Sequence, residues 1–257
     1  MIRLAALAIV ALSFVGCGGA TDPTLVETVE QTYPLDSTAS ISVTNRDGAI
    51  RIYGGGDQLK VQAIKKAYSA ERLNKIKINV VARPKTVSIT TDYPPQTTWG
   101  LSDRSGTVDY TIIVPETAQL VRVELANGEV AVEGLRGGSV RARLGSGLLF
   151  ARNCFSDLEL SVATGNVSLA YDWWERARFS IDVGAVRGHV LAFFPGDAAF
   201  QLSAEAPHGK IANDFIEKEE RHAEPANKID MLVGNDRDVH VKIHATDGNI
   251  RIAEVNP

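Results

Sequence analysis

The side chains best suited to ligand contact in this sequence are four aromatic residues: Trp99, Tyr171, Trp173 and Trp174. Indole and phenol rings join a large apolar face to a polar group, so exposed ones can stack on sugars or on a protein partner. Core packing is the competing role. In extended chain the adjacent Trp173 and Trp174 point to opposite sides, so at least one is expected to be buried. We take all four as candidate contacts to a protein or glycan ligand.

The five histidines are spaced in ways that do not suit a metal ion. His240 and His244 flank Lys242 in a segment of alternating polarity, and four residues of strand span about 13 Å. That distance is too long for two ligands of one ion, and the lysine between them would repel a cation. The other histidines stand alone, without cysteines or paired carboxylates at ligand spacing. We therefore expect no metal site and no cofactor.

Motifs of catalysis are missing from the sequence. There is no His-Glu-x-x-His run, no glycine-flanked nucleophilic serine and no phosphate-binding glycine loop. Asp236 and Asp238 form one acidic pair, in a charged turn with Arg237. Two carboxylates on one face of a solenoid could hydrolyse a polysaccharide. The sequence therefore predicts no enzymatic activity, with a polysaccharide-active enzyme as the alternative.

The composition is that of an ordinary globular protein. Of the 257 residues, 44% are hydrophobic and 23% are charged, which argues against intrinsic disorder. The formal net charge of -4 disfavours binding of nucleic acid through a basic surface. Two cysteines are too few for a scaffold stabilised by disulfides.

The N-terminus has the pattern of a targeting segment. A basic start at Arg3 is followed by the apolar run Leu4 to Val15, which is too short to span a bilayer as a helix. The run ends at Gly16 and Cys17, which resemble the bacterial lipobox, where the cysteine is lipidated and becomes the first residue. We predict a lipoprotein signal peptide over residues 1–16. An ordinary secretory signal with an incidental cysteine is the alternative.

Processing at this site would define the mature protein. Removal of residues 1–16 takes away Arg3 and changes the formal charge from -4 to -5. Residues 17–25 read as a lipidated tether that holds the protein to a membrane through Cys17. Because Gly18 is not aspartate, the usual sorting rule would send the protein to the outer membrane of a host with two membranes. Cys154 is left without a partner, and its apolar flanks predict a buried, unreactive thiol.

The rest of the chain repeats a unit of strand, glycine turn and strand. Apolar and polar residues alternate on both sides of each turn, as in Val121, Val123 and Leu125 before Asn127-Gly128. Successive turn glycines are 19, 18, 23, 21 and 39 residues apart, the last being about two periods, from Gly128 through Gly147, Gly165, Gly188 and Gly209 to Gly248. This period predicts stacked coils around a continuous apolar ladder. Antiparallel hairpins in a sandwich would explain the same turns.

The chain before residue 116 is less regular. An early copy of the repeat surrounds Gly48, and strands are expected over residues 59–65, 76–81 and 86–90. Ser69 is a good N-cap for a short helix over residues 70–76. We predict an all-β, repetitive β-solenoid of the single-stranded β-helix type over residues 26–257. Residues 26–115 would contain one short helix near its N-terminal cap, and residues 116–257 would form regular coils.

These segments resemble the bacterial DUF4097 family, described as "putative adhesins" and also called toastrack domains. The resemblance covers nearly all of the mature chain and rests on degenerate motifs in a specific order: Ile41 to Gly48, Tyr110 to Pro115, Val121 to Gly128, Leu202 to Gly209 and Val239 to Ile252. It implies a repetitive β-solenoid in the bacterial envelope, often on lipoproteins or membrane proteins, and it brings no catalytic residues.

Together these patterns predict a non-enzymatic, lipid-anchored protein of the cell envelope. Its rigid solenoid would serve adhesion, ligand binding or scaffolding, with an unidentified protein or glycan as ligand. Besides the enzyme, a component of envelope-stress signalling is an alternative, and it would need a membrane partner.

Overall fold

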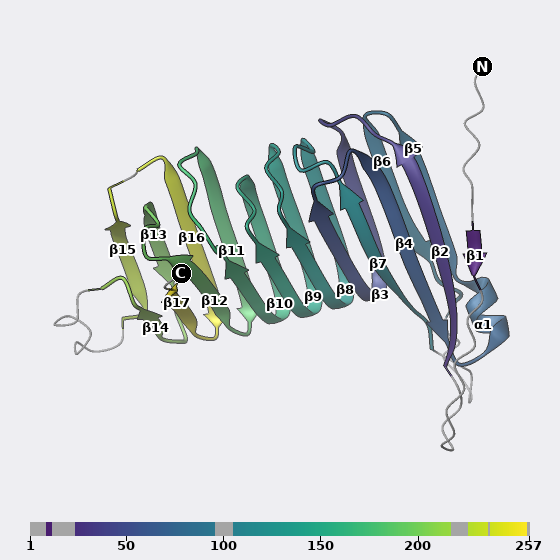
Figure 1. The fold of residues 1–257 in the computed structure, drawn as a ribbon. Coiled ribbons are helices and arrows are strands. Elements are labelled where there is room, and N and C mark those ends of the chain that lie inside the picture. The colour runs from purple at the N-terminus through teal and green to yellow at the C-terminus, as the bar shows by residue number, and fades with distance from the viewer. Residues whose placement is uncertain (1–8, 12–23, 96–104, 217–225, 236, 256–257) are drawn as a thin grey trace.

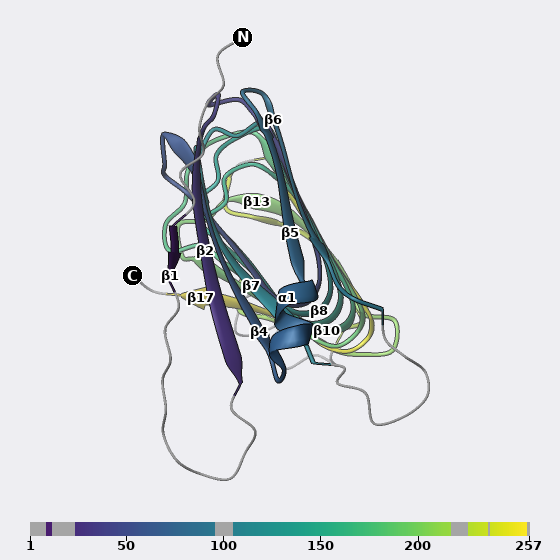
Figure 2. The ribbon, with the colours of Figure 1, turned by 90° about the vertical axis from the view of Figure 1, so that its right-hand side faces the viewer.

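A computed structural model describes residues 9–11, 24–95, 105–216, 226–235 and 237–255. In this part of the chain, one helix accompanies a single sheet of 17 strands. The strands stand side by side in a long row (Figure 1). Figure 2 looks along the row and shows two walls of strands that meet at one edge. The fold is therefore an all-β solenoid, as predicted.

The central rungs of the solenoid are long strands that each bend once at a glycine. They are β8 (Leu120–Glu133), β9 (Ser139–Arg152) and β10 (Asp157–Ala170). Each pairs with the next in parallel along its whole length, through the bend. We call the sheet formed by the halves before the bend the first wall, and the sheet formed by the halves after it the second wall. Parallel pairing excludes the sandwich of antiparallel hairpins.

Glycine is required at the bends because the rungs approach closely there. Gly128 and Gly147 have φ values of 133° and 136°, in a region that other residues rarely adopt. A Cβ atom at Gly128 would lie 1.8 Å from the carbonyl oxygen of Gly48, and one at Gly147 would lie 1.8 Å from that of Gly128. The glycines that set the sequence period thus form a column along the edge where the walls meet.

The stacking order departs from the chain order at the C-terminal end. The remaining rungs each consist of two strands: β11 (Phe179–Arg187) with β12 (Val190–Pro195), β13 (Phe200–Glu205) with β14 (Ile211–Asn213), and β16 (Val239–Asp247) with β17 (Ile250–Val255). The rung of β16 and β17 pairs with β11 and β12 on one side and with β13 and β14 on the other. The interval of 39 residues from Gly209 to Gly248 is therefore not two successive coils. After β14 the chain forms β15 (Lys228–Val233), which pairs with β13, and β16 and β17 then lie between two earlier rungs.

The N-terminal end carries more covering strands. The first bent rung, β3 (Ser40–Gly54), pairs with β8 on one side and with β6 (Thr86–Asp92) and β7 (Thr107–Val114) on the other. Antiparallel strands extend both walls: β5 (Lys77–Arg83) on β6, and β4 (Gln58–Ala67) then β2 (Leu25–Pro34) on β7. A short strand, β1 (Ile9–Ala11), pairs with β2 and lies in the segment expected to be removed with the signal peptide.

The short helix lies at this same end (Figure 2), as predicted. Helix α1 spans Ala70–Lys75, and the Ser69 side chain accepts a hydrogen bond of 3.3 Å from the backbone N–H of Arg72. That bond satisfies one of the donors left open at a helix start.

The core fills the space between the two walls. On β8, Val123 of the first wall and Val130 and Val132 of the second wall are fully buried, and equivalent positions are buried on the other rungs. Each such side chain contributes about 1.5–3 kcal/mol by leaving water. Side chains facing outward are polar on the first wall, where Arg143 lies between Glu124 and Ser161 in register.

Candidate functional site

A column of aromatic side chains fills the core at the C-terminal half, among the loops that join one rung to the next. Tyr171 stacks on Phe194 with ring centroids 5.7 Å apart, and Phe194 lies 4.6 Å from Phe200. Trp174 packs against Phe200 at 5.6 Å, and Phe215 packs against it from another side at 5.9 Å. These rings come from four separate segments, so the column is a product of the stacking.

Of the aromatic residues predicted as ligand contacts, Tyr171 lies in the core. Its side chain is only 1% exposed, and its hydroxyl donates a hydrogen bond of 2.6 Å to the backbone oxygen of Cys154. Burial raises the pKa of Tyr171 well above the ordinary value. The ring is a core residue, because packing in a stacked column offers it more apolar contact than the surface does.

The two tryptophans next to it lie in different surroundings. Trp173 is 44% exposed, and its indole N–H donates to Glu175 at 2.7 Å, while its ring lies 5.9 Å from Phe155. Trp174 is partly buried against the aromatic column. Neither ring is fully buried, so the expectation that at least one of them is buried holds only in part. Trp99 and Cys17 lie outside the described residues.

Trp174 also lines a hollow at the C-terminal end of the stack, which we call the C-terminal pocket. Its volume is about 570 Å³, and its main side chains are Trp174, Arg176, Asp197, Phe215, Leu232 and Asn235. They come from the loop after β10, the loop between β12 and β13, the turn after β14, and the end of β15. The pocket opens where the aromatic column reaches the surface. This is so because β14 is only 3 residues long and covers little of the second wall.

The polar groups of the C-terminal pocket are not used by the fold. Arg176, Asp197 and Asn235 make no side-chain hydrogen bond or ion pair with the residues that the structure describes, and all three are exposed. The indole N–H of Trp174 is buried and has no partner in the same part of the chain. A hollow with an aromatic floor and a few unpaired polar groups can bind a small amphipathic molecule.

A second hollow of about 500 Å³ lies on the outer face of the second wall, beside Phe150 and Phe193. Its charged groups, Arg152 and Asp172, already form an ion pair of 2.6 Å with each other. The pKa of Asp172 is lowered mainly by the hydrogen bond from Asn153 and further by this pairing with Arg152. This hollow therefore offers a ligand fewer open polar groups than the C-terminal pocket does.

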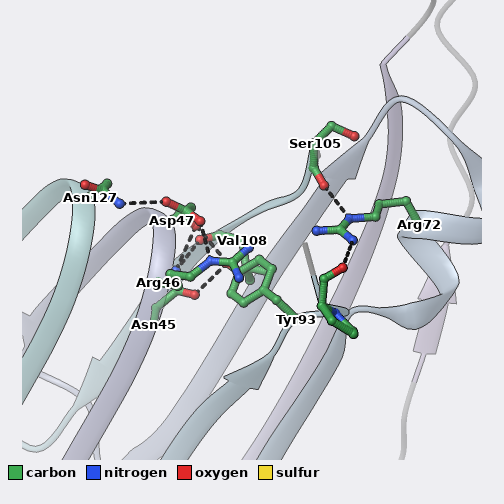
Figure 3. A network of polar contacts seen from close by, with 9 residues as sticks. Asn45, Arg46, Asp47, Arg72, Tyr93, Ser105, Val108 and Asn127 are labelled. Atoms are coloured by element: carbon green, nitrogen blue, oxygen red, sulfur yellow. Dashed lines mark hydrogen bonds and ion pairs between the residues drawn. The ribbon is translucent and has the colours of Figure 1, made fainter. Parts of the chain in front are cut away.

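Toward the opposite end of the stack lies a polar network (Figure 3). The Asn45 amide donates to the backbone oxygen of Val108 at 2.8 Å, and its oxygen accepts from the Tyr93 hydroxyl at 2.7 Å. The Arg46 guanidinium lies 4.2 Å over the Tyr93 ring. Burial raises the pKa of Tyr93. Most of these groups bond to one another, so the network holds β3 to its covering strands.

The histidines and acids do not gather into a metal or catalytic centre in the described part of the chain. His240 and His244 face outward on β16, and the ring of His244 contacts the Thr246 hydroxyl at 3.1 Å. Asp238 forms an ion pair of 3.4 Å with Arg178, and Asp236 lies outside the described residues. Within the same residues, no helix has the length and apolar character needed to cross a membrane.

The second cysteine is buried, as predicted. Cys154 is 0% exposed, and burial raises the pKa of its thiol to about 11. A thiol with so high a pKa carries almost no thiolate at neutral pH and reacts slowly.

Comparison with known proteins gives a family and a fold. The sequence profile described as Toastrack DUF4097 matches residues 25–253. None of the curated proteins compared with the chain matches it. The structure of a putative cell adhesion protein from Clostridium sporogenes ATCC 15579 aligns with a TM-score of 0.53 at 15% identity, over 88% of this chain and 99% of its own. Two others align over 88% of this chain and 97% of their own at 10% identity: a putative adhesin from Bacteroides fragilis NCTC 9343 (TM-score 0.34) and a putative lipid binding protein from Parabacteroides distasonis ATCC 8503 (0.30).

Proposed function

Because the chain belongs to the Toastrack DUF4097 family, we propose that it is a non-enzymatic envelope protein, anchored by lipid on Cys17, which displays a binding site at the far end of a rigid solenoid. Adhesion or ligand capture is the role of that site. The name of the Clostridium sporogenes protein, which shares the fold, supports a role in adhesion.

One observation carries the proposal: β2, the strand that follows the predicted tether, and β14, which lies beside the C-terminal pocket, are at opposite ends of one stack of strands (Figure 1). The tether leads into β2, which extends the second wall at the N-terminal end. From β2 the second wall continues through β4, β7, β3, β8, β9, β10, β12 and β17 to β14, beside the pocket. At a strand spacing of about 4.8 Å, this row is about 43 Å long.

The stack is suited to be a spacer because it cannot bend easily. Each rung is held to the next by a ladder of backbone hydrogen bonds on both walls and by one continuous core. In such a solenoid every repeat is fixed by its neighbours. A ligand held in the pocket would therefore stay at a constant distance from the anchored end.

The pocket also supports binding in preference to hydrolysis. Glycosidases commonly use two carboxyl groups on either side of the scissile bond. Among its described lining residues, the C-terminal pocket has one carboxylate, Asp197. Incubation with a panel of envelope and plant polysaccharides should yield no new reducing ends and no unsaturated products. Either product would favour the enzyme.

The anchor is tested by Cys17→Ser. The variant should lose acylation and appear in the soluble fraction or as the uncleaved precursor, while the parent protein stays with the membrane. In a host with two membranes, we expect the parent in the outer one. A Cys17→Ser variant that fractionates with the membrane as the parent does would refute the lipid anchor.

The display geometry is tested with fluorophores at the two ends of the stack. Lys77 on β5 and Lys228 on β15 are exposed and are suitable for single cysteine substitutions. Cys154 will not compete for the label, since it is buried and its pKa is about 11. In proteoliposomes with a quencher on the lipid headgroups, we expect strong quenching for Lys77→Cys and little for Lys228→Cys. Equal quenching would show that the solenoid lies flat on the membrane.

A further inference from the structure

The floor of the C-terminal pocket is an aromatic surface that the fold holds rigid. Trp174 and Phe215 both pack on Phe200, which is fully buried, at ring distances of 5.6 Å and 5.9 Å. Tyr171 and Phe194 lie 5.4 Å and 5.9 Å from Trp174. Neither pocket ring can turn without disturbing this column. The surface is therefore preorganised, so little conformational entropy is lost when a ligand stacks on it.

The polar groups around this floor have a shape that suits hydrogen bonds to the hydroxyl groups of a ligand. Arg176, Asp197 and Asn235 carry a guanidinium, a carboxylate and an amide, each a planar group with two or more donor or acceptor sites. None of them is paired with another described residue. Because they come from three separate loops, they can reach a bound molecule from different sides. Vicinal hydroxyls present two neighbouring donors and acceptors, which such planar groups can bond together.

The charge and size of the pocket narrow the class of possible ligands further. The described lining residues include one guanidinium, of Arg176, and one carboxylate, of Asp197, so their two formal charges cancel and an ionic ligand has no advantage. The volume of about 570 Å³ falls in the range of small-molecule sites. Gly234 forms a tight part of the wall: a Cβ atom there, where φ is 62°, would lie 2.8 Å from the Cβ of Ala199.

From these features we infer that the C-terminal pocket binds a neutral pyranose at the end of a glycan chain. The ring would place its apolar C–H face on Trp174 and Phe215, and its hydroxyls would bond to Asp197, Asn235 and Arg176. This assignment rests on the proposed function, because it names the ligand class of the displayed site.

The inference is tested by binding of defined sugars to the full chain, purified in detergent micelles. The probes are the methyl α-glycosides of glucose, galactose and mannose, and N-acetylglucosamine, with indole as an apolar probe. Saturation-transfer NMR reports contact, and intrinsic tryptophan fluorescence gives the affinity. We expect at least one sugar to bind with a Kd in the millimolar range, with its ring protons saturated more strongly than its hydroxymethyl group.

Three variants locate the site. Asp197→Ala and Asn235→Ala alter exposed side chains that the fold does not use, and each should weaken sugar binding by about tenfold, the effect of a lost hydrogen bond to a charged or amide group. Trp174→Phe keeps an aromatic ring in the column and should abolish the fluorescence change. Trp173→Phe is the matched control next to it, and it should bind the sugar as the parent does.

Three results would overturn the inference. They are no binding of any probe sugar, binding that is unchanged in Asp197→Ala and Asn235→Ala, or binding of indole without any sugar. The proposed function is judged separately by the Cys17→Ser fractionation and the quenching experiment. Failure of sugar binding with intact anchoring and display would refute only the ligand class.

Discussion

The two ends of the solenoid are closed in different ways. At the N-terminal end, antiparallel strands β2, β4 and β5 extend both walls, and helix α1 lies beside them (Figure 2). At the C-terminal end, β15 covers the first wall, while β14 is only 3 residues long on the second. A solenoid exposes core side chains wherever a wall has no cover. The incompletely covered end is therefore where a pocket can form.

The chemistry of the two ends differs accordingly. The N-terminal end buries polar groups and pairs most of them: Lys65 is 7% exposed, and its ammonium lies 2.8 Å from a carboxylate oxygen of Glu27. The C-terminal end buries aromatic rings and leaves the polar groups Arg176, Asp197 and Asn235 open at the surface. Paired polar groups stabilise a structure, whereas unpaired ones at an aromatic surface are available to a ligand.

The largest difference between the ends is expected from alanine at a bend glycine. In Gly48→Ala, a Cβ atom would lie 2.3 Å from the Val108 oxygen at a φ of 124°, on a rung held from both sides. We expect a loss of more than about 4 kcal/mol in the free energy of unfolding in urea. Gly209→Ala brings a Cβ to 1.8 Å from the Gly248 oxygen, but its outermost rung can shift, so we expect about 2–3 kcal/mol.

Gly55→Ala is the control for backbone strain in this pair. Gly55 has a φ of 131° with no atom within 4 Å of a built Cβ. Its substitution should cost about 1–2 kcal/mol, from conformation alone. If Gly209→Ala destabilised the protein as much as Gly48→Ala, the C-terminal rung would be as firmly held as the N-terminal one.

A smaller effect is expected from the buried ion pair of the N-terminal end. Glu27→Gln removes the charge that compensates the Lys65 ammonium, whose other neighbour is the backbone oxygen of Ile76 at 3.5 Å. Because Glu27 itself is partly exposed, we expect a loss of about 2–3 kcal/mol in urea unfolding, below the range for a fully buried pair. A change below about 1 kcal/mol would show that water reaches Lys65 and that this end is looser than its burial suggests.

Alkaline pH should act on the C-terminal half before the N-terminal end. Burial raises the pKa of Cys154 from 9.0 to about 11 and that of Tyr110, near the N-terminal end, from 10.0 to about 12. The unfolded chain releases the thiol proton first, so stability should fall as pH rises above about 9. The loss from Cys154 should reach about 1.4 kcal/mol at pH 10.

The variant Cys154→Ala isolates this contribution. The stability of this variant at neutral pH will differ from that of the parent. The comparison therefore concerns the slope of the free energy of unfolding against pH between pH 9 and pH 10. We expect that slope to become flatter in Cys154→Ala and to remain as in the parent in Tyr110→Phe, because the loss of stability from Tyr110 is expected above pH 10. An unchanged slope in Cys154→Ala would place the alkaline transition elsewhere.

The smallest effect is expected from the middle of the first wall, away from both ends. Glu159 bonds to Arg141 at 3.3 Å and to Arg143 at 3.0 Å, and all three side chains are exposed. Glu159→Gln should change the free energy of unfolding by less than about 1 kcal/mol, and even this difference from the parent should disappear in high salt. It is also the exposed counterpart of Glu27→Gln. A cost equal to that of Glu27→Gln would remove the distinction between the ends and the middle.

Local patterns in the sequence were enough for the repeating part of the fold. Alternation of apolar and polar residues identified the strands, and the period of the glycines identified the bends, because both depend on sterics within a few residues. The Ser69 cap located α1 for the same reason. The family resemblance agrees with the matched profile over residues 25–253.

The order in which the rungs stack could not be predicted from the sequence. Every rung has nearly the same pattern of apolar residues around a glycine, so any rung could pair with any other as far as local sterics are concerned. The placement of β16 and β17 between two earlier rungs depends on how all the rungs pack together. The early copy of the repeat around Gly48 likewise pairs with β8, where Ser40 lies opposite Leu120, which is 80 residues further along the chain.

The same distinction between local and nonlocal determinants applies to the candidate site. The sequence determined that Cys154 would be buried, since this follows from its apolar neighbours. Only the tertiary structure decided that Tyr171 lies in the core and that Trp174 meets Asp197, Phe215 and Asn235 in one pocket. Their loops are far apart in the chain, and it is the nonlocal stacking of the rungs, with one end left partly uncovered, that brings them together.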